Sequence, residues 1–297
     1  MATIKKNHNK QTREIFHKIH LDQISSKQGL KKMKSLLTIK NMKLNKNYFK
    51  NKICADLGCG STGAGAYNLL KLGSKFVHLL DMDAHIINPI NKNLKYFKNK
   101  YKISIGAIEK APYENNYFDF ILCQGVLHHA LDEDKCLKEI YKKLKRGGKF
   151  LLTIHGDGGL INNFTMKVAR QEYRKNKFFK IVLDNIFNGK INSYKKFFYK
   201  SYDNRTRKLV QYLKKFIDKD MILTIQDRIL SPKYKAFKEE NLKKKLKKIG
   251  FKRIYRIKKE IKYKNLRTLL APLYYHHNHE ISRALYGDGI ISLIMQK

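Results

Sequence analysis

The sequence has few cysteines and no hydrophobic stretch of membrane-spanning length. It holds four cysteines in 297 residues, with no CxxC pair, so no disulfide framework is expected and reduced thiols are the simplest interpretation. The residues from Met1 to Lys6 lead into polar sequence, without the apolar run of a secretory signal. No stretch approaches the roughly 20 apolar residues of a transmembrane helix. These absences argue against secretion and membrane insertion, and we expect a cytoplasmic protein.

Acidic residues are also scarce. The chain has 24 Asp and Glu against 64 Lys and Arg, which gives a formal net charge of +40. Such an excess favours nucleic acid or an anionic membrane as a partner when it is gathered into a local stripe. Here lysine is far commoner than arginine, and the excess runs from Lys5 to Lys297 alongside abundant Asn, Ile and Tyr. We interpret it mainly as a compositional preference and keep nucleic-acid binding as an alternative.

Apolar runs and amphipathic segments alternate regularly from Lys52 onward, which is typical of βαβ units and a parallel sheet. The expected strands cover residues 53–57, 76–81, 103–105, 118–124, 150–155, 251–257 and 290–295, and the expected helices cover 64–72, 86–97, 135–145 and 239–249. The lysine-rich residues 1–48, with spaced apolar positions, predict an N-terminal helical lid. The main domain would span 49–297. The strand pattern stops between about 157 and 234, which predicts an inserted helical cap.

A glycine-rich segment follows the first predicted strand and precedes the first predicted helix. It reads Asp56-Leu57-Gly58-Cys59-Gly60-Ser61-Thr62-Gly63-Ala64-Gly65. Glycines in this place remove Cβ atoms and permit positive φ, so a nucleotide-like ligand can lie against the main chain near a helix N-terminus. The spacing of Gly58, Gly60 and Gly63 fits G-x-G-x-x-G. A tight turn that binds no ligand is the alternative interpretation.

Two cofactor classes use such a loop. Asp81 ends the second predicted strand, where a carboxylate can accept hydrogen bonds from both ribose hydroxyls, and this suits NAD as well as S-adenosylmethionine. Asp56 separates the two. A carboxylate next to a pyrophosphate is unfavourable, whereas it attracts the ammonium group of a methionine moiety. Charge complementarity therefore favours S-adenosylmethionine.

The glycine loop and Asp81 belong to a recognisable series of six segments. They are Asp56–Gly60 (DLGCG), Asp81, Gly106–Glu109 (GAIE), Asn116–Asp119 (NYFD), Gly125–His129 (GVLHH) and Leu144–Gly148 (LKRGG). In order and approximate spacing, the series resembles class I S-adenosylmethionine-dependent methyltransferases, in the subgroup akin to quinone-biosynthesis methyltransferases. The resemblance implies a doubly wound, Rossmann-like α/β fold. Its sheet would be mostly parallel and seven-stranded, with an antiparallel last strand and the helical cap as an insertion.

The resemblance also implies which residues bind the cofactor. They are Asp56, Gly58, Cys59, Gly60, Gly63, Asp81, Met82, Ala107, Ile108 and Gln124. Asp56 and the glycines would line the methionine end. Asp81 would bind the ribose, with Met82 against the adenine. The residues after the third strand would border the base, and Gln124 would lie near the sulfonium.

The sequence departs from the family pattern at two positions. The glycine loop is one residue longer than the usual form, so Thr62 stands where a third glycine is common and Gly63 is expected to take that role. Ala107 stands where many relatives carry an acid for the adenine amino group. Base recognition would then rest on backbone groups near Ile108. Neither departure removes the charge argument from the two aspartates.

No catalytic residue is assigned. Methyl transfer from a sulfonium is an in-line displacement on an activated carbon, so alignment and desolvation can supply most of the acceleration. His128, His129 and His155 follow predicted strands at the edge where ligands bind, and could serve as a base toward a hydroxyl acceptor. For the first two, loop orientation or packing is the preferred interpretation.

No metal site is predicted either. His276, His277 and His279 lie close together, yet they lack a cysteine or carboxylate at ligand spacing apart from Glu280. Coincidental surface histidines are the preferred interpretation. The aromatic residues of the predicted cap could line an acceptor pocket or stack on bases, but their near-helical spacing favours packing within the cap.

We therefore expect an enzyme that moves a methyl group from S-adenosylmethionine to an oxygen, nitrogen or carbon of a small molecule. A tRNA or rRNA acceptor is the first alternative, although the sequence holds no recognisable RNA-binding module. A nicotinamide-dependent oxidoreductase built on the same glycine loop is the second alternative. The third is a non-enzymatic basic binding protein that keeps the fold without a cofactor.

Overall fold

A computed structural model describes residues 10–17, 38–187, 204, 226, 228–231, 233–257, 284 and 287–297. The chain divides into two compact units. The first comprises residues 1–157, 232–260 and 288–297, and the second comprises 158–231 and 261–287. Most of the predicted lid and the histidines at 276, 277 and 279 lie outside the described residues. The lid and cap boundaries therefore stay predictions.

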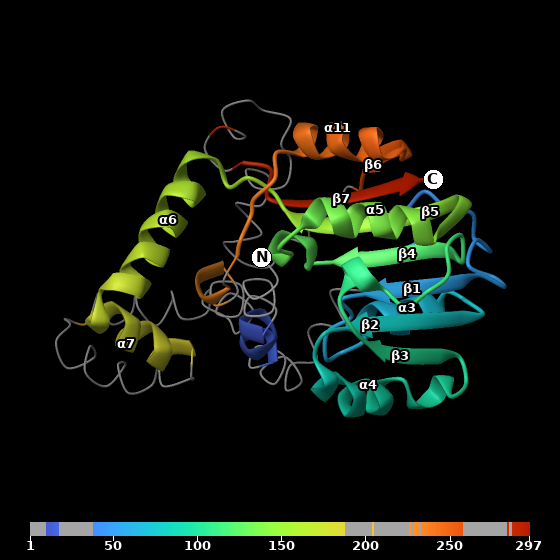
Figure 1. Cartoon of the computed structure of the whole chain (residues 1–297), viewed down its shortest axis with the longest axis horizontal. Coiled ribbons are helices and arrows are strands. Elements are labelled where there is room, and N and C mark those ends of the chain that lie inside the picture. The colour runs from blue at the N-terminus through green and yellow to red at the C-terminus, as the bar shows by residue number, and fades with distance from the viewer. Residues whose placement is uncertain are drawn as a thin grey trace. The chain divides into compact units, whose positions relative to one another are not determined.

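The first unit is built on a seven-stranded sheet in the order β3-β2-β1-β4-β5-β7-β6 (Figure 1). The strands are β1 (Ile53–Leu57), β2 (Phe76–Asp81), β3 (Tyr101–Ile105), β4 (Phe118–Gln124), β5 (Leu144–His155), β6 (Lys252–Arg256) and β7 (Ile290–Gln296). The pairs among β1 to β5 are parallel, and β7 is antiparallel to both β5 and β6. The predicted doubly wound sheet with an antiparallel last strand is confirmed.

The chain changes its direction of winding at β1. This strand pairs with β2 on one side, where Asp56 lies opposite Leu79, and with β4 on the other, where Asp56 lies opposite Leu122. The loops that leave the carboxyl ends of β1 and β4 therefore run to opposite sides of the sheet. In open α/β sheets, ligands bind in the crevice at this point.

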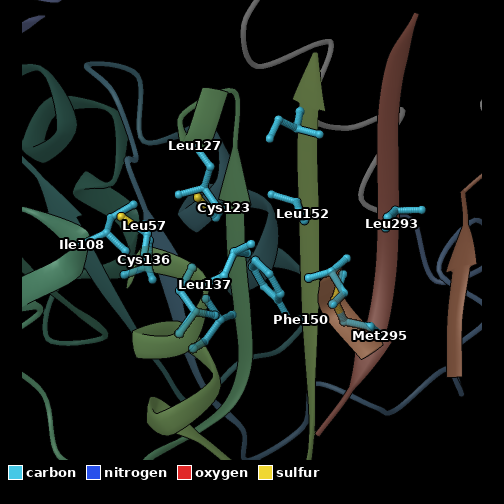
Figure 2. Close-up of a cluster of buried hydrophobic side chains, with 14 of the residues drawn as sticks. Leu57, Ile108, Cys123, Leu127, Cys136, Leu137, Phe150, Leu152, Leu293 and Met295 are labelled. Carbon is cyan, nitrogen blue, oxygen red and sulfur yellow. The ribbon is translucent and has the colours of Figure 1, made fainter. Parts of the chain in front are cut away.

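Both faces of the sheet are buried under helices. The alternation along each strand sends one set of side chains to α5 (Glu133–Lys143) and α11 (Glu239–Ile249), and Figure 2 shows Leu57, Cys123, Leu137 and Phe150 in this cluster. The other set packs under α3 (Ala64–Lys71) and α4 (Ile87–Asn93). Burial on both faces explains why the strands read as apolar runs. All four cysteines are free and buried in these clusters.

Two elements differ most from their predicted bounds, while β3 begins two residues earlier than predicted and α5 lies two residues earlier. The single helix predicted at 86–97 is divided into η1 (Ala84–Ile86), α4 and η2 (Lys95–Phe97). Pro89 has no N–H to donate, so it is tolerated only within the first turn of a helix, and α4 begins two residues before it. Strand β5 begins at residue 144 rather than 150, because an irregularity in its register with β4 and the positive φ of Gly147 let the strand start earlier.

The described part of the first unit also contains two short 3-10 helices, η3 (Ile108–Lys110) and η4 (Leu127–His129). Residues 10–17 are α-helical. The second unit contains α6 (Gly159–Lys175) and α7 (Lys177–Phe187). Arg170 of α6 donates hydrogen bonds to the carbonyl groups of Arg228 and Ser231. None of the helices in the described ranges has the length and hydrophobicity needed to cross a membrane.

Candidate functional site

The glycine loop after β1 has the backbone that its sequence predicts. Gly58, Gly60 and Gly63 have φ angles of 74°, 59° and 55°, a region that side chains disfavour. A Cβ atom added to Gly58 would lie 2.2 Å from Cγ2 of Val126. The loop is therefore a close backbone approach between the ends of β1 and β4, and no larger residue fits at Gly58 without a shift.

Asp56 is buried at the start of this loop, with an exposed fraction of 2%. Its Oδ2 accepts a hydrogen bond of 2.9 Å from the backbone N–H of Ala66 in α3. A Cβ atom on Gly65 would come within 2.4 Å of the same oxygen, so this glycine is what allows the carboxylate to approach the helix. This contact was not predicted from the sequence, although Gly65 is the last residue of the glycine-rich segment.

Burial raises the pKa of Asp56 to about 7, because the charged form loses its hydration. The hydrogen bond from Ala66 acts in the opposite direction, and the negative charge of Asp81 raises the pKa further. The two aspartates are thus close enough to interact electrostatically. A cation bound near both would favour the ionised form of Asp56.

Asp81 joins two loops at the carboxyl edge of the sheet. Its Oδ2 accepts a hydrogen bond of 2.9 Å from the N–H of Gly60, and its Oδ1 accepts one of 3.1 Å from the N–H of Asp83. The side chain is half-buried. A carboxylate offers about four acceptor positions, so Asp81 keeps capacity for the hydroxyl groups of a ligand.

The remaining predicted cofactor residues follow the strands that flank this loop. Met82 and Ala107 are half-buried after β2 and β3, whereas Ile108 packs in the hydrophobic cluster of Figure 2. Gln124 ends β4, and its Oε1 is buried without a hydrogen-bond partner among the described residues. Cys59 is buried in the cluster on the opposite face. All of these residues lie at or after carboxyl ends of parallel strands, so the topology brings them to one edge.

A cluster of aromatic rings occupies the same edge after β4 and β5. The rings of His128 and His155 stack with centroids 4.0 Å apart, and Tyr234 lies 5.5 Å from His155. His129 makes a hydrogen bond of 3.0 Å through Nδ1 with the carbonyl of Lys233, and its ring lies 4.8 Å from Phe16. This geometry supports the packing interpretation for His128 and His129. Sequence reasoning missed the contributions of Phe16 and Tyr234, which are distant in the chain.

The histidine cluster is bordered by an ion-pair network at the start of α5. Glu133 forms ion pairs with Lys233, Lys235 and Lys245. Burial raises the pKa of Glu133, but the hydrogen bond from Lys235 and the nearby positive charges outweigh it and hold the pKa at about 2. Three basic side chains near this edge therefore share one acidic partner.

One protein family matches the part of the chain that contains these residues. Residues 55–152 match the model of the methyltransferase domain. The matched range contains the glycine loop, Asp81 and Gln124. The match covers a third of the chain, so it describes the centre of the first unit rather than the whole protein.

Curated relatives of two kinds match part of this chain. Phosphoethanolamine N-methyltransferase 2 of Caenorhabditis elegans is 30% identical over 141 residues, which cover 45% of this chain and 32% of that protein. A tRNA U34 carboxymethyltransferase of Campylobacter fetus is 31% identical over 105 residues, which cover 35% of this chain and 36% of that protein. The chain thus matches about a third of the length of either relative.

A solved structure extends the similarity of fold beyond the methyltransferase domain. A chain of the complex between the Haloferax volcanii Trm112 methyltransferase activator and a methyltransferase matches with a TM-score of 0.52. The match covers 96% of each chain at 13% sequence identity. At that identity the likeness concerns the fold alone, and it agrees with the Rossmann-like sheet described above.

Proposed function

We propose that this chain is a class I S-adenosylmethionine-dependent methyltransferase acting on a small-molecule acceptor. One observation carries the proposal: Asp81 holds the glycine loop through Gly60 and the next loop through Asp83, at the carboxyl ends of β1 and β2. The methyltransferase domain match covers these same residues. A subgroup akin to quinone-biosynthesis methyltransferases is part of the proposal and rests on the motifs alone.

The residues present fit the cofactor. The cradle at Gly58 is one that a Cβ atom would fill, and the buried Oε1 of Gln124 offers an acceptor. In this proposal Asp56, Gly58, Cys59, Gly60 and Gly63 form the methionine end of the site. Asp81 binds the ribose, Met82, Ala107 and Ile108 border the adenine, and Gln124 lies near the sulfonium. When bound, the cofactor supplies an electrophilic methyl group.

Electrostatics support S-adenosylmethionine over a dinucleotide. Burial is the main cause that raises the pKa of Asp56, and the negative charge of Asp81 raises it further. A pyrophosphate placed there would add negative charge, whereas the sulfonium and ammonium groups of S-adenosylmethionine add positive charge. A nicotinamide-dependent oxidoreductase is therefore the weaker proposal.

The local charge near the site supports a small acceptor. Lys233, Lys235 and Lys245 share Glu133 as an ion-pair partner, so part of their positive charge is offset and they attract phosphates less strongly. A tRNA acceptor is a second candidate, favoured by the net charge of +40 and by the tRNA U34 carboxymethyltransferases among the relatives. The relative named as a phosphoethanolamine N-methyltransferase favours the first candidate.

Cofactor binding is the first test. We expect S-adenosylhomocysteine to bind the purified chain in calorimetry, and Asp56→Ala and Asp81→Ala each to weaken binding by tenfold or more. Asp119→Ala is the matched control, because it removes a carboxylate from the amino end of β4. Unchanged affinity in both site variants, or binding of NADH without S-adenosylhomocysteine, would contradict the proposal.

The acceptor is tested separately. Affinity for bulk tRNA should be weak and should change little between low and physiological salt, because few phosphate contacts are expected. A steep salt dependence, together with transfer of a labelled methyl group to tRNA, would favour the second candidate instead. Label in the small-molecule fraction of a cell extract would support the first.

A further inference from the structure

We propose that His17, Asp83 and His85 form a binding site for a divalent zinc-like cation. Nδ1 of His17 lies 3.0 Å from Oδ2 of Asp83, and Nδ1 of His85 lies 2.8 Å from Oδ1. One ligand atom from each residue lies within 4.8 Å of the other two. The imidazole rings of the two histidines have centroids 4.2 Å apart. Three potential ligands thus converge on one point.

The donor set matches the chemistry of zinc. Zn²⁺ binds imidazole nitrogen and carboxylate oxygen at about 2.0–2.2 Å, so tetrahedral ligand atoms lie about 3.3 Å apart. Shifts of a few tenths of an ångström would bring each histidine and its Asp83 oxygen to that spacing. The ligand atoms of the three residues lie within 4.8 Å of one another, so binding would also draw the two histidines together by up to about 1.5 Å. A site with two histidines and one carboxylate leaves a fourth position for water. The harder ions Mg²⁺ and Ca²⁺ prefer oxygen ligands and fit less well.

The carboxylate of this cluster is held in place before any ion binds. Asp83 is 2% exposed, and its Oδ1 accepts a hydrogen bond of 3.1 Å from the N–H of His85 at the start of η1. The side chain of His85 is 73% exposed and that of His17 is 32% exposed. The cluster therefore combines a fixed acid with two adjustable imidazoles that an ion can reach from solvent.

The site joins distant parts of the chain. His17 lies in the helical residues 10–17, 66 residues before Asp83. Phe16 of the same helix contacts the ring of His129. A bound ion would fix this helix beside the loop after β2, since metal ligation is far stronger than the two part-buried hydrogen bonds of Asp83 with the histidines.

The clamp would also act on the cofactor site, a consequence that rests on the proposed function. The N–H of Asp83 donates to Oδ1 of Asp81, the residue proposed to bind the ribose. Tying the loop that carries Asp83 to the helix at residues 10–17 would therefore also restrain Asp81. We expect the ion to tighten cofactor binding without contacting the cofactor.

The test of the site is a metal titration made without cofactor. Zn²⁺ affinity would be measured by competition with a chromophoric chelator, and Co²⁺ by its visible absorption, which reports tetrahedral nitrogen and oxygen ligands. Both titrations would use a chain carrying His276→Ala, His277→Ala and His279→Ala, so that the second histidine group does not contribute. We expect one equivalent of Zn²⁺ per chain.

Variants locate the ion. His85→Ala, at an exposed position that the fold does not need, should weaken Zn²⁺ binding at least tenfold, and so should His17→Ala. The matched control is His78→Phe on β2. This variant keeps an aromatic ring in contact with Phe76, Tyr113 and Tyr117. Absence of stoichiometric Zn²⁺ binding, or equal binding by the His17→Ala/His85→Ala double variant, would overturn the site and leave a hydrogen-bonded cluster.

The coupling has its own measurement. We expect S-adenosylhomocysteine to bind severalfold more tightly with Zn²⁺ than with a chelator, and this difference to vanish in His85→Ala. Equal affinity in both conditions would overturn the coupling. Failure to bind S-adenosylhomocysteine under either condition would count against the proposed function, and the zinc titration would still decide the site.

Discussion

Asp56 and Asp119 stand near opposite ends of two paired strands, Asp56 toward the carboxyl end of β1 and Asp119 toward the amino end of β4. Asp119 accepts a hydrogen bond of 2.9 Å from the N–H of Ile53 and forms ion pairs with Lys52 and Lys145. In the described part of the chain, Asp56 has no basic side chain within ion-pair distance. One acid is matched by cations, and the other is not.

The two carboxyl groups respond in opposite directions. Burial raises the pKa of Asp119, but the hydrogen bonds from Ile53 and Lys145 outweigh it and the net pKa is lowered. Burial dominates at Asp56 and raises its pKa to about 7. A folded chain gains stability from the first arrangement and loses it from the second. Such a loss is expected where a carboxylate is kept for a ligand.

The largest effect should come from closing the cradle itself. Gly58→Ala places a methyl group against Val126 at a positive φ, which should lower the free energy of unfolding by about 2–4 kcal/mol. Binding of S-adenosylhomocysteine should fall at least 100-fold in calorimetry. Adding Val126→Ala should restore part of the stability, because it removes the contact but keeps the backbone strain.

Gly147 supplies the matched control for that variant at the amino edge. It has a φ of 79°, and a Cβ atom there would have only Nε2 of Gln296 within 4 Å, at 3.6 Å. Gly147→Ala should cost about 1 kcal/mol from strain alone and leave cofactor affinity unchanged. If both variants lost affinity equally, the cradle would not be the special feature of the carboxyl edge.

The fold was predictable because several of its strands are largely buried. Apolar runs such as Phe118–Gln124 and Ile290–Gln296 have one clear interpretation, and glycines or aspartates mark their ends. The strand that begins at Leu144 was missed at its start, because a polar stretch with two glycines does not look like a strand. Its pairing with β4 there is a tertiary effect with no local signal.

The site was predictable only as far as single segments describe it. The glycine loop and Asp81 lie within 30 residues and carry a known spacing. The contacts of Asp83 with His17 and of His129 with Phe16 join residues far apart in the chain. Such contacts depend on how the helix at residues 10–17 packs, and amphipathic spacing predicts a helix without predicting its partner.

Glu133 tests whether pairing, rather than position at one edge, decides the cost of a buried acid. It lies near the carboxyl edge yet is paired with three lysines. Glu133→Gln should lower the free energy of unfolding by about 1–3 kcal/mol at pH 7, as for hydrogen bonds to charged groups. Urea denaturation would measure it, with Glu114→Gln at an exposed position as the control.

The lowered pKa of Glu133 fixes how its contribution to the free energy of unfolding changes with pH. Its folded pKa of about 2 lies below the ordinary value of 4.5, so its stabilisation is present above pH 4.5 and is lost as the pH falls toward 2. The difference between wild type and Glu133→Gln should therefore shrink between pH 5 and pH 3. A constant difference over that range would mean that packing, not charge, is lost in the variant.

Removing the charge of Asp56 should have the opposite effect on stability. Its folded pKa of about 7 lies above the ordinary value of 3.8, so the folded state is increasingly penalised as the pH rises from 4 to 7. Asp56→Asn should raise the free energy of unfolding by about 1–2 kcal/mol at pH 8, after relaxation of the site, and by little at pH 4. Cofactor affinity should fall in the same variant.

Asp119→Asn completes the comparison, because it should lower the free energy of unfolding at pH 8. The pKa of Asp119 is depressed, so its contribution is present above the ordinary pKa and disappears in acid. Urea denaturation of both variants at pH 8 measures the two signs directly. Loss of stability in Asp56→Asn as well would mean that the charge on the acceptor strengthens the hydrogen bond from Ala66 by more than burial of that charge costs.

The smallest effect should come from one lysine at the amino edge. Lys145 lies 3.2 Å from Oδ2 of Asp119, but its side chain is 42% exposed, so Lys145→Ala should cost about 0.2–1 kcal/mol. High salt should reduce that cost, and Lys138→Ala, at an exposed position, is the control in the same urea series. Asp119→Ala should cost more, because it also removes the acceptor for the N–H of Ile53. If Lys145→Ala matched it, the lysine rather than the backbone hydrogen bond would be what stabilises the carboxylate at this edge.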